Sequence, residues 1–156
     1  MVRLIDFFVQ PDTFYVVQVY AQGGDVFDRL SQRETYTEKD AKDLCKRLLE
    51  TMRDVHKRGF AHRDLKPENL LLKDTVDDAL ILVADFGFAR RVPEGGLTTR
   101  CGTPAFVAPE IVLGTPYTQA ADMWSVGVCL FMLLGGYPPF QDAEHRGLFR
   151  KIRAAD

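Results

Sequence analysis

The sequence predicts an α+β fold in which two strands at the amino end precede a mainly helical remainder. Residues 2–8 and 14–20 are rich in aromatic and β-branched side chains and flank a turn-forming segment at 10–13. Residues 41–55 repeat apolar side chains at three- and four-residue spacing, and residues 123–134 are apolar almost all round. These patterns indicate one domain with a helical core.

The composition is typical of a soluble globular domain that buries a core. The chain has 156 residues, of which 46% are hydrophobic and 27% are charged. Its net charge of −2 provides no field that would attract nucleic acid or an anionic membrane, so we expect neither as a partner. The cysteines are scattered and odd in number, which predicts reduced thiols in a protein of the cytoplasm or the nucleus.

The predicted strands lead into Ala-Gln-Gly-Gly-Asp at 21–25, a segment that by itself is typical of a hairpin ending in a helix cap. A long helix is expected to begin at Thr37, because Thr37 and Asp40 have the spacing of a capping box. Gly59, which follows two basic residues, marks its end. One face of this helix carries the apolar side chains of Ala41, Leu44, Leu48, Met52 and Val55.

A short hairpin is predicted between residues 70–72 and 80–84. Both runs are apolar, and the polar residues that separate them include an acidic pair at 77–78. A hairpin returns the chain to the point at which it began. We therefore expect Asp85 to lie near Asn69.

The carboxyl half combines an irregular segment with two helices. Residues 88–107 contain too many prolines and glycines for regular structure. The apolar helix at 123–134 is expected to be buried on all sides, and it is too short to cross a bilayer. A final amphipathic helix is expected to begin near Asp142, with an apolar side formed by Leu148, Phe149 and Ile152.

Three short motifs occur in order within this framework. They are His-Arg-Asp-Leu-Lys-Pro-Glu-Asn at 62–69, Asp-Phe-Gly at 85–87 and Ala-Pro-Glu at 108–110. Each of the first two, taken alone, is commonly a solvated turn or the end of a strand. In this order, and with a hairpin between the first two, the three resemble the catalytic loop, the metal-binding tripeptide and the end of the activation segment of the protein kinases.

The resemblance extends over essentially the whole chain and narrows the class. Lys66 in the first motif and Thr103 before a proline match the serine/threonine kinases, in which Thr103 would help to position the substrate. Residues 122–140 resemble the calcium/calmodulin-dependent kinase group. The resemblance implies an incomplete kinase-like fold, divided into small-lobe strands at 1–20, a hinge at 21–25 and a truncated, mainly helical large lobe at 26–156.

The resemblance also assigns catalytic and metal-binding roles. Asp64 would accept the proton of the substrate hydroxyl as a general base, and Lys66 would neutralise charge on the transferring phosphate. Asn69 and Asp85 would hold Mg²⁺, because that cation prefers hard oxygen ligands. Phosphoryl transfer depends on positioning and charge neutralisation, which this set of side chains would supply.

The same resemblance implies an ATP site and a regulatory site. The backbone of Val19 and Ala21 would bind the adenine base, Asp25 would reach the ribose, and Leu71 would pack against the adenine. Arg63 suggests a pocket for a phosphorylated residue, for which the best-placed acceptor is Thr99. An unmodified polar loop is the alternative interpretation of the segment around Thr99, and the residues leave both open.

Three hypotheses about function remain at this stage. The first is a serine/threonine protein kinase that transfers the γ-phosphate of ATP to protein serine or threonine hydroxyls. The second is a catalytically impaired fragment or a pseudokinase-like binding module, because no glycine-rich loop or nucleotide-clamping strand lysine is seen. The third is a chain that does not fold alone. The intact Asp64, Asn69 and Asp85 favour descent from an active enzyme, and the resemblance leaves open whether a full-length form binds calmodulin.

Overall fold

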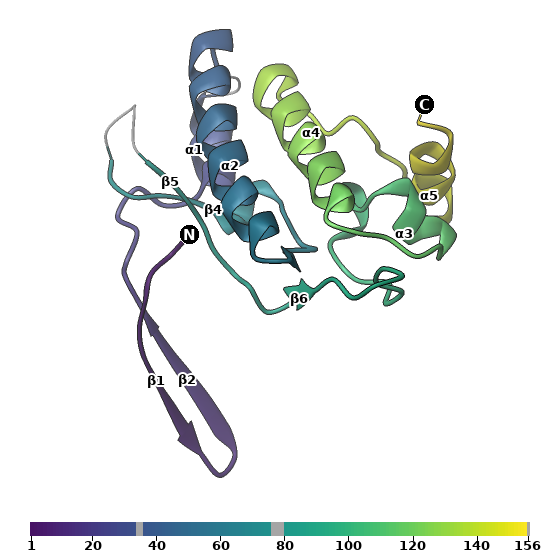
Figure 1. Cartoon of the computed structure of the whole chain (residues 1–156). Coiled ribbons are helices and arrows are strands. Elements are labelled where there is room, and N and C mark those ends of the chain that lie inside the picture. Colours follow the sequence, from purple (N-terminus) through teal and green to yellow (C-terminus); the bar gives the residue numbers. More distant parts are fainter. Residues whose placement is uncertain (34–35, 76–79, 156) are drawn as a thin grey trace.

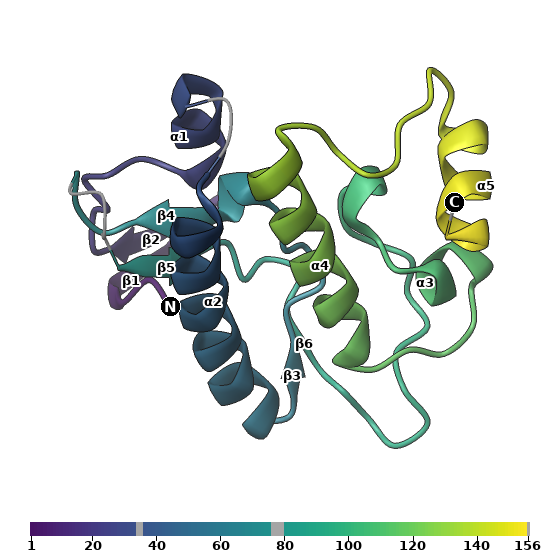
Figure 2. The same ribbon diagram turned by 90° about the horizontal axis from the view of Figure 1, so that it is seen from above.

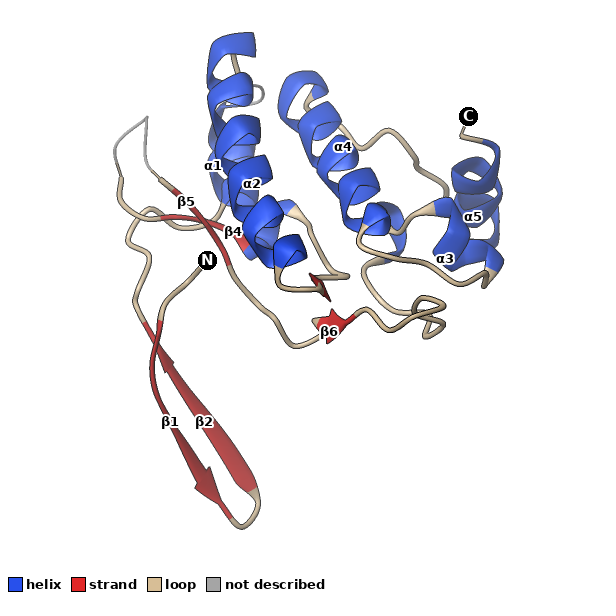
Figure 3. Ribbon diagram, in the orientation of Figure 1, coloured by secondary structure: helices blue, strands red, loops and turns tan. Residues whose placement is uncertain are grey.

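The computed structural model describes residues 1–33, 36–75 and 80–155, which form a two-stranded hairpin attached to a mainly helical body (Figures 1 and 3). Strands β1 (Leu4–Gln10) and β2 (Thr13–Gln18) pair antiparallel, as the sequence predicts. Figure 1 shows this hairpin projecting away from the helices. Its side chains are exposed on both faces, so the strands contribute little to the core of the body.

Helix α1 (Val26–Arg33) follows the hairpin; the sequence indicated a helix cap at 21–25 but not the extent of this helix. The Asp25 carboxylate accepts a hydrogen bond from the backbone N–H of Asp28 (2.8 Å), which satisfies one of the free amides of the first turn. Val26 and Leu30 bury the inner side of this helix. Asp25 is therefore a helix cap in the structure, whatever further role it has.

Helix α2 (Glu38–Lys57) matches the sequence prediction in its start, its end and its buried face. The Thr37 hydroxyl oxygen accepts a hydrogen bond from the backbone N–H of Asp40 (3.1 Å), as expected of the cap. Gly59 has a φ of 81°, which a residue with a side chain adopts at a cost, and it turns the chain out of the helix. The side chains predicted to face the core are all buried: Ala41, Leu44, Leu48, Met52 and Val55.

Two small antiparallel pairs position the loops that follow α2. Strands β4 (Leu70–Leu72) and β5 (Ile81–Val83) form the predicted hairpin, and the acidic pair at 77–78 lies outside the described residues. Strand β3 (Phe60–Ala61) pairs with β6 (Arg90–Arg91), a long-range contact that no local pattern predicts. The β3–β6 pair joins the chain before the first motif to the chain after the second, and the β4–β5 pair closes the stretch between the two motifs.

Helix α4 (Ala120–Gly135) packs beside α2 in both views of the molecule (Figures 1 and 2). Val126, Cys129 and Leu133 lie in the main core cluster. The prediction that the helix is buried on all sides is wrong, because Phe131 and Leu134 are 41% and 43% exposed. Among the described residues, no helix combines the length and apolarity needed to cross a membrane.

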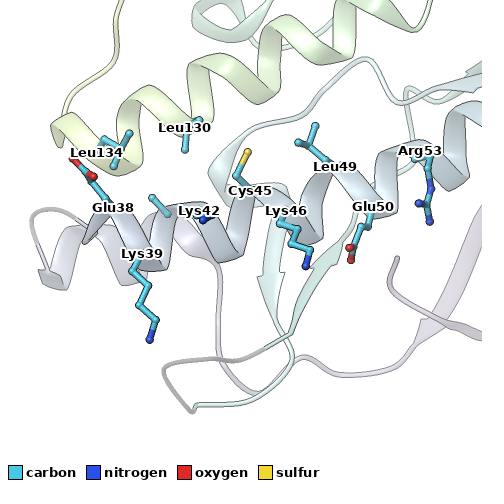
Figure 4. Close-up of a pocket in the computed structure, with 11 residues that line it drawn as sticks. Glu38, Lys39, Lys42, Cys45, Lys46, Leu49, Glu50, Arg53, Leu130 and Leu134 are labelled. Carbon is cyan, nitrogen blue, oxygen red and sulfur yellow. The ribbon is translucent and has the colours of Figure 1, made fainter.

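The exposed side of α4 forms one wall of a groove whose other wall is α2 (Figure 4). The groove has a volume of about 850 Å³. In Figure 4 the side chains of Cys45, Leu49 and Leu130 point into the space between the two helices, whereas Lys39 and Lys46 point away. Apolarity around a helix thus does not guarantee burial, because a face is buried only where another element covers it.

A second cluster of buried residues lies between α4 and the carboxyl end. Helix α3 (Pro109–Leu113) and helix α5 (His145–Ala154) pack together there. Leu148 and Ile152 are buried, as predicted, and Phe149 is partly buried against this cluster. The helix begins at His145 rather than at Asp142, whose carboxylate instead accepts a hydrogen bond from the backbone N–H of Glu144 (3.1 Å).

The difference between the two sides of α4 predicts unequal costs of truncating neighbouring leucines. Leu133 is 1% exposed in the core, so Leu133→Ala should lower the free energy of unfolding by about 2–5 kcal/mol. Leu134→Ala, the matched control in the same helix, should cost less than about 1 kcal/mol because Leu134 is 43% exposed. Urea unfolding measures both values, and equal losses would contradict the assignment of the core face.

Candidate active site

The loop at 62–69 is anchored by the buried carboxylate of Asp122 in the first turn of α4. Its oxygens accept hydrogen bonds from the backbone N–H of His62 (2.9 Å) and of Arg63 (2.8 Å). The ring Nε2 of His56, on α2, lies 2.7 Å from the same carboxylate. Arg63 has a φ of 73°, an uncommon conformation for a residue with a side chain, and these bonds hold it there.

Three polar side chains of the anchored loop form a group with Thr103, which belongs to the later irregular segment. The Asp64 carboxylate is 5% exposed and accepts hydrogen bonds from the backbone N–H (2.8 Å) and the hydroxyl (2.7 Å) of Thr103. Lys66 Nζ lies 3.1 Å from the Thr103 hydroxyl oxygen and 3.6 Å from Asp64 Oδ2. Asn69 Nδ2 donates to the backbone oxygen of Asp64 (2.8 Å) and to its carboxylate (3.3 Å). The structure therefore joins the residues that the sequence singles out for catalysis.

Asp85 lies next to this group, as the predicted hairpin requires. The backbone N–H of Ala84 donates to the backbone oxygen of Asn69 (2.9 Å), which fixes the start of the Asp-Phe-Gly motif beside the loop. Asp85 has a φ of 54°, and its exposed carboxylate accepts a hydrogen bond from the backbone N–H of Gly87 (3.1 Å). Asp85 is thus exposed and follows directly on the residue whose backbone contacts Asn69.

Asn69 and Asp85 carry side-chain oxygens of the kind that a magnesium ion takes as ligands. The amide nitrogen of Asn69 is used by Asp64, which leaves its amide oxygen as the group available to a cation. Across the described ranges, no three His, Cys, Asp or Glu side chains gather closely enough to hold a metal. Magnesium commonly takes only one or two protein oxygens and completes its shell with water and substrate phosphates, so a small donor set suits it.

The His62 side chain is a neutral imidazole that packs beneath the loop backbone and hydrogen-bonds to it. The side chain is fully buried, with Nε2 3.0 Å from the backbone oxygen of Ala84 and Nδ1 3.3 Å from the backbone N–H of Asp64. Nδ1 must accept from that N–H, so the ring is protonated at Nε2 only. Burial is the main cause that lowers the pKa of His62. The ring also contacts Phe86 edge-on, with centroids 4.8 Å apart.

The residues expected to bind the nucleotide are only partly brought together. Asp25 pairs with Leu71 in an isolated β-bridge, and Leu71 lies in β4 beside the loop. Ala21 is buried, whereas Val19 is exposed at the base of the hairpin and its N–H donates to the backbone oxygen of Arg3 (3.0 Å). Asp25 and Leu71 thus border the loop, and their nucleotide roles stay predictions.

A phenol that sequence reasoning did not identify connects the regulatory residues. The Arg63 guanidinium donates to the backbone oxygen of Phe88 (2.6 Å) and to the Tyr117 hydroxyl (3.2 Å). That hydroxyl donates to the backbone oxygen of Thr99 (2.6 Å). Burial raises the pKa of Tyr117, which keeps the phenol protonated as a donor. Tyr117 stands apart from the three motifs, so nothing in its local sequence signals this contact.

A cavity of about 250 Å³ opens beside the same irregular segment. It is lined by residues on either side of Thr103, including Cys101 and Pro104, and by Phe149 of α5. Thr103 itself contacts the carboxylate of Asp64. The short segment around Thr103 therefore borders both this cavity and the buried carboxylate.

Comparison with known proteins identifies the family. The family model described as protein kinase domain matches residues 1–155, so the chain belongs to the protein kinase domain family. Calcium/calmodulin-dependent protein kinase type 1 of Macrobrachium nipponense is 42% identical over 152 residues, which are 97% of this chain and 44% of that protein. The type 1B kinase of Rattus norvegicus is 43% identical over 155 residues, 99% of this chain and 45% of the relative.

The chain thus spans less than half the length of these relatives. The type 1 kinase of Caenorhabditis elegans shows the same relation, with 42% identity over 97% of this chain. The resemblance to the calcium/calmodulin-dependent kinase group and the kinase-like α+β fold are confirmed. The division of the chain at 20 and 25 and the roles of individual site residues stay predictions.

The burial of His62 predicts a dependence of stability on pH. Its pKa is lower in the folded chain than in the unfolded chain, where it is about 6.5. The unfolded chain therefore binds more protons below that pH, and the free energy of unfolding should fall as pH decreases from about 6.5. Protonation would also place a second donor opposite the N–H of Asp64.

Urea unfolding between pH 5 and 8 measures this effect. In His62→Gln the decline on acidification should be smaller than in the parent, because glutamine binds no proton. His145→Gln, at an exposed position, is the matched control and should keep the parental slope. An unchanged slope in His62→Gln would show that another group causes the decline.

Proposed function

We propose that this site transfers the γ-phosphate of ATP to serine or threonine hydroxyls of proteins. The observation that carries the proposal is the placement of the Thr103 hydroxyl, which donates to Asp64 at 2.7 Å while its oxygen lies 3.1 Å from Lys66 Nζ. A substrate hydroxyl bound in the same manner would face a proton acceptor on one side and a positive charge on the other. Those are the needs of a nucleophile in phosphoryl transfer.

The residues around Asp64 prepare it for this role. Asn69 and the backbone of Thr103 donate to the carboxylate, and Asp122 holds the loop that carries it. Asp64 accepts the proton from the hydroxyl, and Lys66 balances the negative charge of the transferring group. Such a preorganised set lowers the barrier because little rearrangement is needed at the moment of reaction.

Asn69 and Asp85 would hold Mg²⁺, which would neutralise charge on the ATP phosphates. We place the ribose near Asp25 and the adenine near Leu71, since both border the catalytic loop and pair with each other. The backbone of Val19 and Ala21 would complete the adenine site. This part of the proposal rests on the resemblance to kinases and on the position of β4.

We also propose that phosphorylation of Thr99 regulates the site. Arg63 is buried, and among the described residues it has no carboxylate within ion-pair distance. Its guanidinium is already linked to the backbone of Thr99 through Tyr117. A phosphate on Thr99 would offer this buried cation a charged partner and would order the segment around Thr103.

The names of the relatives support two further parts of the proposal. Protein substrates would present the acceptor hydroxyl, and a longer form of the chain would respond to calmodulin, as the names of the relatives suggest. We place the protein in the cytoplasm or the nucleus, where its three free cysteines would stay reduced.

A second candidate is a kinase-like module that binds partners and transfers phosphate slowly or not at all. Two observations favour it for the 156 residues alone: Asp85 is exposed, and the β1–β2 hairpin is exposed on both faces. The nucleotide side of the described structure is therefore open to water. Positioning of ATP can contribute about 7–11 kcal/mol to the reaction, which an intact Asp64 cannot replace.

Magnesium-dependent nucleotide binding tests the role of Asp85. Asp85→Ala should weaken binding of Mg·ATP by about tenfold or more, because a charged oxygen ligand is lost. Titration calorimetry on the 156-residue chain measures this, and Asp12→Ala, in the remote hairpin turn, should bind as the parent does. Equal affinities of the parent and Asp85→Ala would contradict the assigned role.

Phosphoryl transfer tests Asp64 and should be measured in the longest expressed form that contains these residues. Asp64→Asn keeps the size of the side chain but removes the base, so the turnover of a threonine peptide should fall by about 10²–10⁴-fold. The control Asp54→Asn, at an exposed position of α2, should retain parental turnover. Brisk turnover by Asp64→Asn, with Mg·ATP binding intact, would remove the residue from the mechanism.

A further inference from the structure

Helix α5 has a charge that the rest of the chain does not share. Its ten residues include three arginines and one lysine and no acidic residue, whereas the chain as a whole has a net charge of −2. Helix α5 therefore has a net positive charge although the chain as a whole is slightly negative. The excess of positive charge on α5 is not needed for solubility, since charged residues already make up 27% of the sequence.

The arginines share the solvent side of α5. Positions 146, 150 and 153 recur at four- and three-residue spacing, which places them on one face of a helix. Leu148 and Ile152 occupy the opposite face, 7% and 0% exposed, and anchor the helix against its neighbours. We refer to Arg146, Arg150 and Arg153 as the arginine face; it lines a shallow depression of about 300 Å³.

Two acidic residues border this depression, and one of them is already neutralised. Asp142 Oδ2 lies 3.2 Å from Lys151 Nζ, and the other carboxylate oxygen accepts from the N–H of Glu144. A β-carbon at Gly147 would lie 2.2 Å from the Asp142 carboxylate, so glycine lets that carboxylate lie against the helix. Glu144 is the remaining acidic group at the rim.

The arginine face keeps its charge available. Arg153 Nε donates to the backbone oxygen of Phe149 (3.3 Å). Arg146 and Arg150 have no carboxylate within ion-pair distance anywhere in residues 1–33, 36–75 and 80–155, although Arg150 influences Asp142 from further away. Both side chains are exposed, so a partner can reach them.

Helix stability does not explain Arg146. It is the second residue of α5, and a cation in the first turn opposes the helix dipole, whereas Lys151 and Arg153 in the last turn are favoured by it. An unfavourable charge kept beside two others on one face points to a contact with something outside the chain.

The arginine face adjoins the candidate active site through α5 itself. Phe149, next to Arg150 in the chain, lines the cavity that also contains Cys101 and Pro104. Thr103, between those two residues, donates to Asp64. A protein whose hydroxyl lies at Asp64 would therefore extend past this cavity toward α5.

We propose that the arginine face of α5 binds an acidic segment of the protein substrate, outside the residue that is phosphorylated. This inference rests on the proposed function only in treating the partner as a substrate. The separation of Arg146 and Arg150 along the helix is about 6 Å, and alternate residues of an extended chain are about 6.6–6.8 Å apart. The segment that fits is thus an extended one with Asp or Glu at every second position.

Direct binding tests the inference without any phosphoryl transfer. The probe is a fluorescent peptide with glutamate at alternate positions, and its control has glutamine at those positions. The 156-residue chain should bind the glutamate peptide in preference, and more weakly as salt rises, because exposed charges are screened. Equal binding of both peptides, or no binding of the glutamate peptide at low salt, would overturn the inference.

Charge reversal locates the contact. Arg146→Glu/Arg150→Glu should weaken binding of the glutamate peptide by about tenfold or more, since attractive charges become repulsive. Lys39→Glu/Lys46→Glu, at exposed positions of α2, makes the same change in net charge and should alter affinity by less than about twofold. Equal losses in the two variants would show a general charge effect and overturn the inference. So would a single-stranded oligonucleotide that binds the arginine face more tightly than the peptide.

Kinetics in the longest expressed form separate this inference from the proposed function. For a threonine peptide with an acidic extension, Arg146→Glu/Arg150→Glu should raise KM and leave kcat unchanged. For the same peptide without the extension, the variant should change neither KM nor kcat. If no form of the protein transfers phosphate but the peptide binds the arginine face, the proposed function fails and the binding site stands. A KM that is unchanged in the α5 variant, with transfer intact, overturns the role in substrate binding.

Discussion

The geometry of the site depends on the hydrogen bonds that the buried carboxylate of Asp122 accepts. It accepts hydrogen bonds from the backbone of His62 and Arg63, and His56 contacts it from α2. Removing the partners of a buried charge costs about 3–5 kcal/mol. Loss of the hydrogen bonds between the loop and the Asp122 carboxylate would therefore be costly, and this holds the loop in place. One side chain thereby joins α2, α4 and the catalytic loop, and it holds Arg63 at a positive φ.

The same dependence extends from the loop to the irregular segment that follows Asp85. Thr103 binds the Asp64 carboxylate through both its backbone and its hydroxyl, so the proposed base helps to position this part of the segment. Tyr117 makes the corresponding link between Arg63 and Thr99. Hydrogen-bonded networks of this kind are sensitive to the loss or gain of a single charged member, which is the physical basis for control by phosphorylation.

Among the described residues, the β1–β2 hairpin and α4 both carry exposed apolar side chains. The β1–β2 hairpin exposes Phe7 and Phe14 on strands that extend away from the body (Figure 1), and α4 exposes Phe131 and Leu134 along its outer side. Contiguous apolar surface of this kind commonly marks a contact with another segment or molecule. The arginine face of α5 is its polar counterpart, a set of charges that the described residues leave unpaired.

The sequence by itself determined those features of the fold and the site that depend on residues close together in the chain. The cap at Thr37, the buried face of α2, the β4–β5 hairpin and the approach of Asp85 to Asn69 all follow from local spacing. Only the tertiary structure decided the rest: the pairing of β3 with β6, the contact of His56 with Asp122, the link through Tyr117, and the exposed side of α4. Each of these joins residues distant in the chain, and a local pattern states how polar a face is but not which distant element covers it.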